Sequence, residues 1–411
     1  MPDGTAAPAA DPSAADIRAA AALAGRGVAA TTAMIRDLHV AIARRAFTAS
    51  GPPATPARLL HDTISTSVYT TVGVAARVAA TAAGVAAAAR AAADPSYRPL
   101  VERPRGNVAL GALNGAWGDW LDRTNSPLAL SMSAHYDRED PQLTGDVSVW
   151  LHGLCETDVA WRLGAADHYG DPHSTHGSRL HDEYGLTPVY VRYNTGLHIS
   201  ANGRSLDELL TDLVAGWPTP VKRLTLVGHS MGGLVIRSAA AQGCEKDSPW
   251  VPLVKRVVYL GSPHLGAPLE VGAAHATRAL RRLAETKPLA DALASRSVGI
   301  KDLRYGDLLE ADWAEVADPD GVRDEPSNCA PLLDGADHYF IGATLGARHD
   351  TRVARIVGDA LVPFASASGT GRTRKLGLDV ERGRHLGGLH HFDLLNHPRV
   401  YAVLREWLAR E

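Results

Sequence analysis

Hydrophobic residues recur along this chain with two different periods, a helical one near the beginning and a strand-like one further on. Residues 15–93 are rich in alanine and carry two apolar stripes at helical spacing. These stripes are Ile35, Leu38 and Ile42, followed by Ile64, Val68 and Val72. The Gly51-Pro52-Pro53 break separates them, so the pattern predicts a pair of helices.

After residue 104, short apolar runs alternate with helical segments. Strands are predicted at residues 128–136, 146–153, 187–194, 224–227, 257–263 and 337–344. Helices are predicted after Ser205, after Ser230 and over residues 400–411, and Ser205 with Glu208 three residues later forms a capping box. This alternation indicates an α/β fold, with a mostly parallel sheet covered by helices on both faces.

The pattern also suggests how the chain is divided. Residues 1–14 are expected to be disordered, 15–104 to form an alanine-rich helical extension, and 105–411 to form the α/β domain. The alternation stops over 267–336, which we interpret as a helical cap or lid, a neutral surface insertion being the alternative. The extension is interpreted as a hairpin packed on the main domain. A membrane-surface or partner-binding helix pair and disorder stay open.

Composition narrows the classes of partner. The net charge is −3 and no long basic stripe occurs, so nucleic acid is not an expected partner. The cysteines at 155, 244 and 329 are scattered, which argues against a disulfide framework and against zinc. The first residues carry Asp3 and Asp11 and no basic segment, unlike a secretory signal.

No run of about 18 strongly apolar residues occurs, so a spanning helix is not expected; residues 71–93 come nearest. We therefore expect a cytoplasmic protein, with peripheral membrane contact through the N-terminal helices left open.

The chemistry centres on the segment LTLVGHSMGGLVIRSA, residues 224–239. An apolar strand runs into Gly228-His229-Ser230-Met231-Gly232 and then into a helix. A serine at such a turn projects its hydroxyl from the carboxyl end of a parallel sheet. In a chain with 39 glycines, a G-x-S-x-G pentapeptide has little specificity, so the strand and helix around it carry the prediction. An inert serine in a structural turn is the alternative.

A serine nucleophile needs a histidine to accept its proton and a carboxylate to orient that histidine. At an elbow of this kind the chain order is serine, acid, histidine. The acid is assigned to Asp359, in preference to Asp337 and Asp350. The histidine is assigned to His391, with its neighbour His390 as the alternative, whereas His397 looks like the start of the last helix.

Two backbone N–H groups should stabilise the oxyanion. Met231, directly after the serine, supplies one. Leu154, which follows His152-Gly153 at the end of an early strand, supplies the other. A thiol nucleophile at Cys155 is rejected, because no histidine is arranged to activate it.

Six segments together resemble a known family: WLHGLCET, RYNTGLHISANGRSLDELL, LVGHSMGG, LGSPHLGAP, VGDALVP and GLHHFDLLNHPRVY. From about residue 111 to the end, the chain resembles α/β-hydrolases of the bacterial esterase and lipase type, near the GPI inositol-deacylase-like branch. The resemblance implies that Ser230, Asp359 and His391 form a catalytic triad. One departure is Ala360, where related lipases often carry glycine.

The expected function is hydrolysis of small-molecule or lipid carboxylic esters through an acyl-enzyme, without a cofactor. A thioesterase or acyltransferase would use the same triad, and a membrane- or partner-recruiting module is the other alternative. Some related lipases bind calcium near the histidine loop, but Asp393 alone is no site, so no metal is expected. An aspartate nucleophile, as in dehalogenases and epoxide hydrolases of this fold, is excluded by Ser230. The oligomeric state is left open.

Overall fold

The structure is a computed structural model. It describes residues 14–49, 55–267, 287, 291, 294–315, 330–348, 358–371 and 374–409. The predictions of a disordered tail over 1–14 and of a cap over 267–336 fall largely outside these described residues, as does Asp350. Contacts divide the chain into two compact units. One comprises 1–110, 123–128 and 275–295, and the other comprises 111–122, 129–274 and 296–411.

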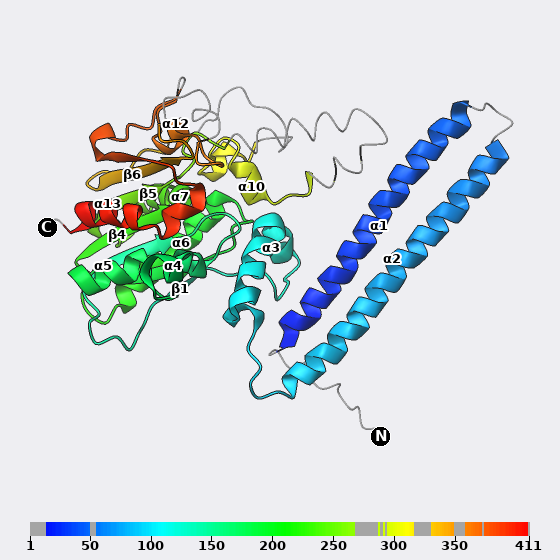
Figure 1. The fold of residues 1–411 in the computed structure, drawn as a ribbon, viewed down its shortest axis with the longest axis horizontal. Helices are drawn as coiled ribbons and strands as arrows, with labels where there is room; N and C mark the ends of the chain where they lie inside the picture. Colours follow the sequence, from blue (N-terminus) through cyan, green and yellow to red (C-terminus); the bar gives the residue numbers. More distant parts are fainter. Residues whose placement is uncertain are drawn as a thin grey trace. The chain divides into compact units, whose positions relative to one another are not determined.

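The first unit contains a long helical hairpin formed by α1 (Ala15–Ala49) and α2 (Thr55–Ala92), which run side by side (Figure 1). Small residues let the two helices approach closely. A Cβ built on Gly84 would lie 2.5 Å from Ala21 Cβ, and one on Gly25 would lie 2.7 Å from Ala80 Cβ. The predicted N-terminal helical extension is therefore confirmed.

Helix α2 bears on the expectation that the chain has no spanning helix. The helix has 38 residues, and its most apolar 18-residue window has a mean hydropathy of 1.6. Only 17% of that window is buried, and by length and composition alone the helix could cross a membrane. The sequence reading had counted only strongly apolar residues. In α2 the hydropathy comes from many alanines and valines, with Arg77 and Arg90 as its charges after Asp62.

The second unit is built on a seven-stranded sheet with the order β1-β3-β2-β4-β5-β6-β7. β1 pairs antiparallel with β3, and all other neighbours are parallel. The strands are β1 (Ser133–His135), β2 (Asp146–Leu151), β3 (Thr187–Arg192), β4 (Arg223–His229), β5 (Val254–Leu260), β6 (Asp337–Thr344) and β7 (Gly383–Gly387). β7 was not predicted, because GRHLG is short, carries two glycines and has no run of apolar residues.

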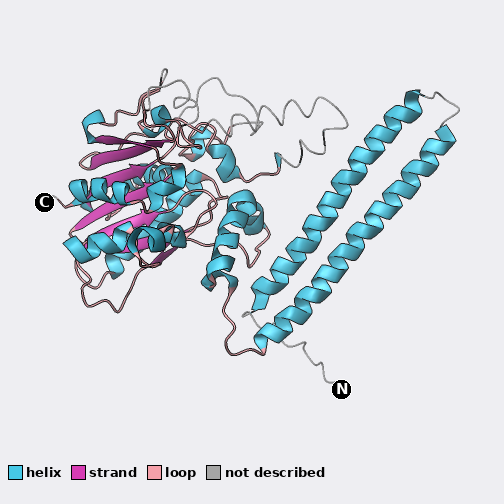
Figure 2. Cartoon of the chain, viewed as in Figure 1, coloured by secondary structure: helices cyan, strands magenta, loops and turns pink. Residues whose placement is uncertain are grey.

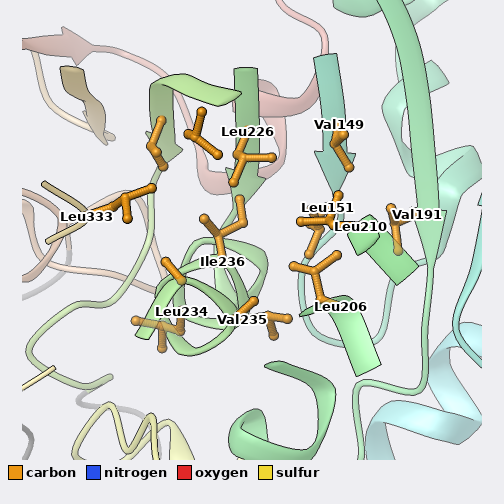
Figure 3. Close-up of a cluster of buried hydrophobic side chains, with 14 of the residues drawn as sticks. Val149, Leu151, Val191, Leu206, Leu210, Leu226, Leu234, Val235, Ile236 and Leu333 are labelled. Atoms are coloured by element: carbon orange, nitrogen blue, oxygen red, sulfur yellow. The ribbon is translucent and has the colours of Figure 1, made fainter. Parts of the chain in front are cut away.

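Successive side chains of the central strands point to opposite faces of this sheet and fill two apolar cores. Leu226 of β4 belongs to one core and Val227 to the other. The first core also contains side chains from the two long helices that follow β3 and β4 (Figure 3). The labelled residues there include Val149, Leu151, Val191, Leu206, Leu210, Leu226, Leu234, Val235 and Ile236.

Helices cover both faces of the sheet, as the alternation of elements predicted (Figure 2). α6 (Ile199–Gly216) and α7 (Met231–Glu245) lie on one face, and α5 (His176–Tyr184) and α13 (Pro398–Leu408) lie on the other. The other α-helices within the described residues are α3 (Pro104–Arg123), α4 (Ala165–Tyr169), α10 (Val298–Asp302) and α12 (Phe364–Ala367). Short 3₁₀ turns are η3 (Leu100–Glu102), η4 (Asp158–Arg162), η5 (Val251–Leu253), η6 (Glu310–Asp312), η7 (Val380–Arg382) and η8 (His391–Leu395).

The predicted capping box at Ser205 is wrong, because α6 begins six residues earlier and Ser205 lies inside it. Tertiary contacts explain the earlier start. The buried carboxylate of Asp302 accepts a hydrogen bond from the N–H of Ile199 at 2.8 Å and so caps the helix from far away in sequence. Gly203 then lets α6 approach α7, since a Cβ there would lie 2.2 Å from Ser238 Oγ.

Candidate active site

Ser230 stands at the turn between β4 and α7, at the carboxyl edge of the sheet. Its backbone is strained, with φ 51° and ψ −121°, a conformation that L-residues rarely adopt. The glycines around it are sterically required. A Cβ on Gly228 would lie 2.4 Å from the N of Gly233, and one on Gly232 would lie 2.5 Å from the Leu151 carbonyl. The turn therefore holds the serine at the start of α7.

Asp359 and His391 form a buried pair beside this edge. Asp359 Oδ2 lies 2.7 Å from His391 Nδ1, and the two side chains are 1% and 3% exposed. Asp359 Oδ1 accepts the N–H groups of Leu361 and Val362, and the N–H of His391 donates to the Asp359 carbonyl at 2.9 Å. The carboxylate is thus held by its own loop and directed at one imidazole nitrogen.

The turn after β5 brings the serine and the histidine into one region. The N–H of Ser230 donates to the Leu260 carbonyl at 2.8 Å. A Cβ on the next residue, Gly261, would lie 3.2 Å from the His391 ring. His229 also packs against His391, with ring centroids 4.7 Å apart. Residues 230, 359 and 391 therefore gather at the carboxyl edge, where open α/β sheets bind ligands.

The two predicted oxyanion donors lie at the same place. Met231 is the first residue of α7, and Leu154 is on the loop after β2. Neither N–H has a hydrogen-bond partner among the residues that the structure describes. Gly153 allows the approach of this loop, because a Cβ there would lie 3.0 Å from Ser230 Cβ. Both amides are thus available to a ligand oxygen.

Sequence reasoning missed a buried ion pair behind the serine. Glu156 Oε2 lies 3.0 Å from His229 Nδ1 and accepts the N–H of Gly153 at 2.6 Å. Burial alone would raise the pKa of Glu156 and lower that of His229, but their mutual attraction outweighs it. The pKa of Glu156 is therefore lowered and that of His229 raised. Glu156 lies in the motif WLHGLCET and His229 in the motif LVGHSMGG. The two residues are 73 positions apart, so only the tertiary structure reveals that they pair.

The loop after β2 has further supports. His152 stacks on Tyr193 with ring centroids 4.3 Å apart, and the Tyr193 hydroxyl donates to the His152 carbonyl at 2.7 Å. Cys155 has a φ of 62°, and its N–H donates to Thr195 Oγ1 at 3.2 Å. Burial and the charge of Glu156 raise the pKa of the Cys155 thiol, which disfavours a thiolate nucleophile.

The other candidate histidines occupy capping positions. His390 is exposed and accepts the N–H of Asp393, and His397 caps α13 by accepting the N–H of Arg399 at 3.1 Å. The Asp393 carboxylate in turn accepts the N–H of His390 at 2.8 Å, so it stabilises the local turn. Within the described residues no group of three or more metal-ligating side chains is found.

Strand order, strained elbow and the loops at the carboxyl edge define this unit as an α/β-hydrolase fold. A family model described as "PGAP1-like alpha/beta domain" matches residues 142–317, a little under half of the chain. The match contains the loop after β2 and the serine turn. The resemblance predicted from the sequence motifs is thereby confirmed.

Solved structures with a similar fold include three hydrolases. A lipase from Bacillus licheniformis, BlEst2 in mature form, is 16% identical, with a TM-score of 0.42 over 67% of this chain and 97% of that one. An esterase from Pyrobaculum calidifontis is 13% identical, with a TM-score of 0.36 over 68% and 81%. Phospholipase PlaB from Legionella pneumophila is 14% identical, with a TM-score of 0.38 over 63% and 58%. No curated protein sequence matches the chain.

Proposed function

We propose that this protein is a serine hydrolase that cleaves carboxylic esters. The observation that carries the proposal is a strained serine at an elbow beside a buried aspartate–histidine pair, with φ 51° at Ser230 and 2.7 Å between Asp359 and His391. An aspartate on Nδ1 leaves Nε2 of His391 to act as the base. The positions after β2 and β4 supply the two amides that such chemistry requires.

In this proposal Ser230 Oγ attacks the ester carbonyl carbon while its proton passes to Nε2 of His391. The N–H groups of Met231 and Leu154 stabilise the resulting oxyanion. Collapse breaks the C–O bond, and the imidazolium returns its proton to the leaving alcohol. Water then attacks the acyl-enzyme with the same proton transfers, releasing a carboxylic acid and free Ser230. Asp359 stabilises the imidazolium throughout.

The decisive experiment compares wild type with Ser230→Ala and Asp359→Asn on p-nitrophenyl esters. Ser230→Ala should abolish turnover while the melting temperature changes little. Asp359→Asn should lower kcat by about 10⁴-fold, because the amide favours the wrong imidazole tautomer. A fluorophosphonate should label the wild type at Ser230, as mapped by peptide mass, and should not label Ser230→Ala. Turnover that survives in Ser230→Ala would reject the proposal.

A thioesterase or acyltransferase would form the same acyl-enzyme and so share these residues. Product analysis with water, alcohols, amines and thioester donors in competition distinguishes the three. Ester hydrolysis predicts free acid as the main product at every acceptor concentration.

We also propose that the hairpin brings the protein to an anionic lipid surface. Both helices expose large aliphatic side chains, among them Ile35 and Ile42 on α1 and Ile64, Val68 and Val78 on α2, each between 47% and 64% exposed. From Ala15 to Ala92 the sequence has eight arginines and three aspartates, an excess of five positive charges in a chain of net charge −3. An apolar face with arginines around it is typical of helices that lie at a membrane interface.

Co-sedimentation with vesicles of neutral or partly anionic phospholipid tests this proposal. The full chain should pellet with anionic vesicles, and Val68→Asp with Val78→Asp should weaken this. The matched control, Thr63→Asp with Thr81→Asp, adds the same charge at exposed polar positions of the same helix and should matter less. If both double variants lose the same amount of vesicle binding, the loss is due to the added charge and not to the apolar side chains. A concentration-dependent dimer that never binds vesicles would assign the face to a second copy of the chain.

A further inference from the structure

One buried ion pair contacts three of the segments around the proposed catalytic groups. Glu156 lies on the loop after β2, and His229 is the last residue of β4, directly before Ser230. The side chains of Glu156 and His229 are 9% and 0% exposed. The imidazole of His229 also contacts two rings, with centroid distances of 6.3 Å to Trp161 and 4.7 Å to His391.

Opposite an ionised Glu156, the contacts of His229 place a proton on each ring nitrogen. Nδ1 faces the Glu156 carboxylate at 3.0 Å, and Nε2 faces the backbone carbonyl of His391 at 3.2 Å. Carbonyl and carboxylate oxygens only accept hydrogen bonds, so both nitrogens must donate. An ionised Glu156 thus pairs with an imidazolium at His229, in agreement with the lowered pKa of Glu156 and the raised pKa of His229.

Two hydrogen bonds of the pair reach the backbone beside groups with a proposed role. Glu156 Oε2 also accepts the N–H of Gly153 at 2.6 Å, and this N–H belongs to the peptide directly before the one that carries the Leu154 amide. His229 Nε2 holds the backbone of His391, whose N–H and side chain are already bound by Asp359. The pair thus links the oxyanion loop, the nucleophile turn and the histidine loop in one chain of hydrogen bonds.

We propose, resting on the serine hydrolase function above, that Glu156 and His229 are positioning residues that set the Leu154 amide and the His391 imidazole relative to Ser230. Stability alone is a weak reason for such a pair, because a buried ion pair often contributes no more than apolar residues of the same volume. Positioning of the catalytic groups is a stronger reason for the pair, because a displacement of about 1 Å at a reacting group can lower the rate by about 10²-fold.

The test uses the full chain with Glu156→Ala, Glu156→Gln, His229→Ala and the double variant Glu156→Ala/His229→Ala. Measured quantities are kcat and KM on a soluble p-nitrophenyl ester, the fluorophosphonate labelling rate, and the melting temperature. Glu156→Ala should lower kcat and the labelling rate together by about 10²-fold with little change in KM, since the lost contacts act in the transition state. Glu156→Gln keeps the shape and should recover much of the loss.

Asp207→Asn is the matched control. Asp207 is also a buried carboxylate, 3% exposed, and accepts hydrogen bonds from Ser248 and Trp250. It has no contact with the three loops, so its variant should lose stability and keep kcat. If Glu156→Ala does not fold, His229→Ala takes its place, and a lowered kcat in His229→Ala with an unchanged kcat in Asp207→Asn at equal melting temperature supports the positioning role.

The double variant supplies an independent criterion. Residues that act as one unit are non-additive, so it should be about as slow as the worse single variant. Additive losses, or a folded Glu156→Ala or His229→Ala variant with unchanged kcat and labelling rate, would overturn the positioning role. That outcome is distinct from failure of the function itself, which would appear as turnover and labelling that persist in Ser230→Ala.

Discussion

Ala360, next to the proposed catalytic Asp359, has a φ of 89° and lies in the left-handed region that favours glycine. Related lipases often carry glycine at this position, and the conformation explains why. The chain turns at Ala360, and the turn brings the N–H groups of Leu361 and Val362 to the Asp359 carboxylate, which accepts both. The alanine therefore costs folding energy at a place where the loop geometry matters.

Ala360→Gly should stabilise the protein. Relief of the left-handed Cβ strain exceeds the extra chain entropy of glycine, for a net gain of about 0.5–1 kcal/mol. The control Ala365→Gly, at an exposed position of α12, should instead lose about 0.5–1 kcal/mol. Urea unfolding measures both changes. A loss in both variants would show that the Ala360 backbone is not strained.

The Glu156–His229 pair should make stability depend on pH. The pKa of His229 is raised above its ordinary value of 6.5, so its contribution is complete below that value and is lost as the pH rises through the raised pKa. The pKa of Glu156 is lowered from 4.5, so its contribution is present above that value and lost as the pH falls through the lowered pKa. Asp359 and His152 are the other titratable groups that act on the pair, and the backbone carbonyl of His391 also raises the pKa of His229.

The free energy of unfolding should be higher for wild type than for Glu156→Gln. This difference should be largest between pH 4.5 and 6.5 and should decline on either side. Urea unfolding from pH 3 to pH 9 measures it. A difference that does not vary with pH would show that the pair is not ionised in the folded protein.

At the scale of elements, the hairpin depends on glycines that differ in what surrounds them. A Cβ on Gly84 would lie 2.5 Å from Ala21 Cβ on the facing helix, whereas one on Gly27 would have no atom within 4 Å. Both glycines are inside helices, where alanine is intrinsically better by about 1 kcal/mol. Packing should therefore reverse the sign of the same substitution at the two sites.

Gly27→Ala should stabilise the hairpin by about 0.5–1 kcal/mol. Gly84→Ala should destabilise it by about 1–3 kcal/mol, because the helices must move apart to accept the methyl group. Circular dichroism during thermal unfolding measures both. Stabilisation by both substitutions would contradict the close contact of α1 with α2.

For the whole molecule, the helical hairpin and the rest of the chain carry net charges of opposite sign. The hairpin has an excess of five positive charges, while the complete chain has a net charge of −3, so the rest of the chain is acidic. If the hairpin binds lipid and the sheet domain cleaves esters, the two activities should respond to different variables. Surface attraction is screened by salt, with a Debye length of about 8 Å at physiological ionic strength.

Raising the salt concentration should therefore weaken vesicle binding and the turnover of vesicle-borne esters, and should change the turnover of a soluble ester little. Ser230→Ala should bind vesicles as wild type does, because its charge and hairpin are unchanged. Sedimentation and ester assays at several salt concentrations check both statements. Loss of vesicle binding in Ser230→Ala would contradict separate roles for the two units.

Periodicity by itself was enough to predict the class of fold. Two helical stripes with a Gly-Pro-Pro break predicted the hairpin, and six apolar runs predicted six of the seven strands, because burial imposes a repeat on each element. The nucleophile turn was also local, since a strand, glycines, a serine and a helix are contiguous in residues 224–239. The roles of Ser230, Asp359 and His391 were inferred from motif order and stay predictions.

Only the tertiary structure decided features whose partners are distant in sequence. Asp302 starts α6 from a hundred residues away, which local capping signals cannot reveal. β7 has too few apolar residues to be recognised alone, yet it pairs with β6 along the sheet edge. Glu156 meets His229 for the same reason: parallel strands bring their carboxyl ends to one edge, and buried charges then require partners wherever the chain supplies them.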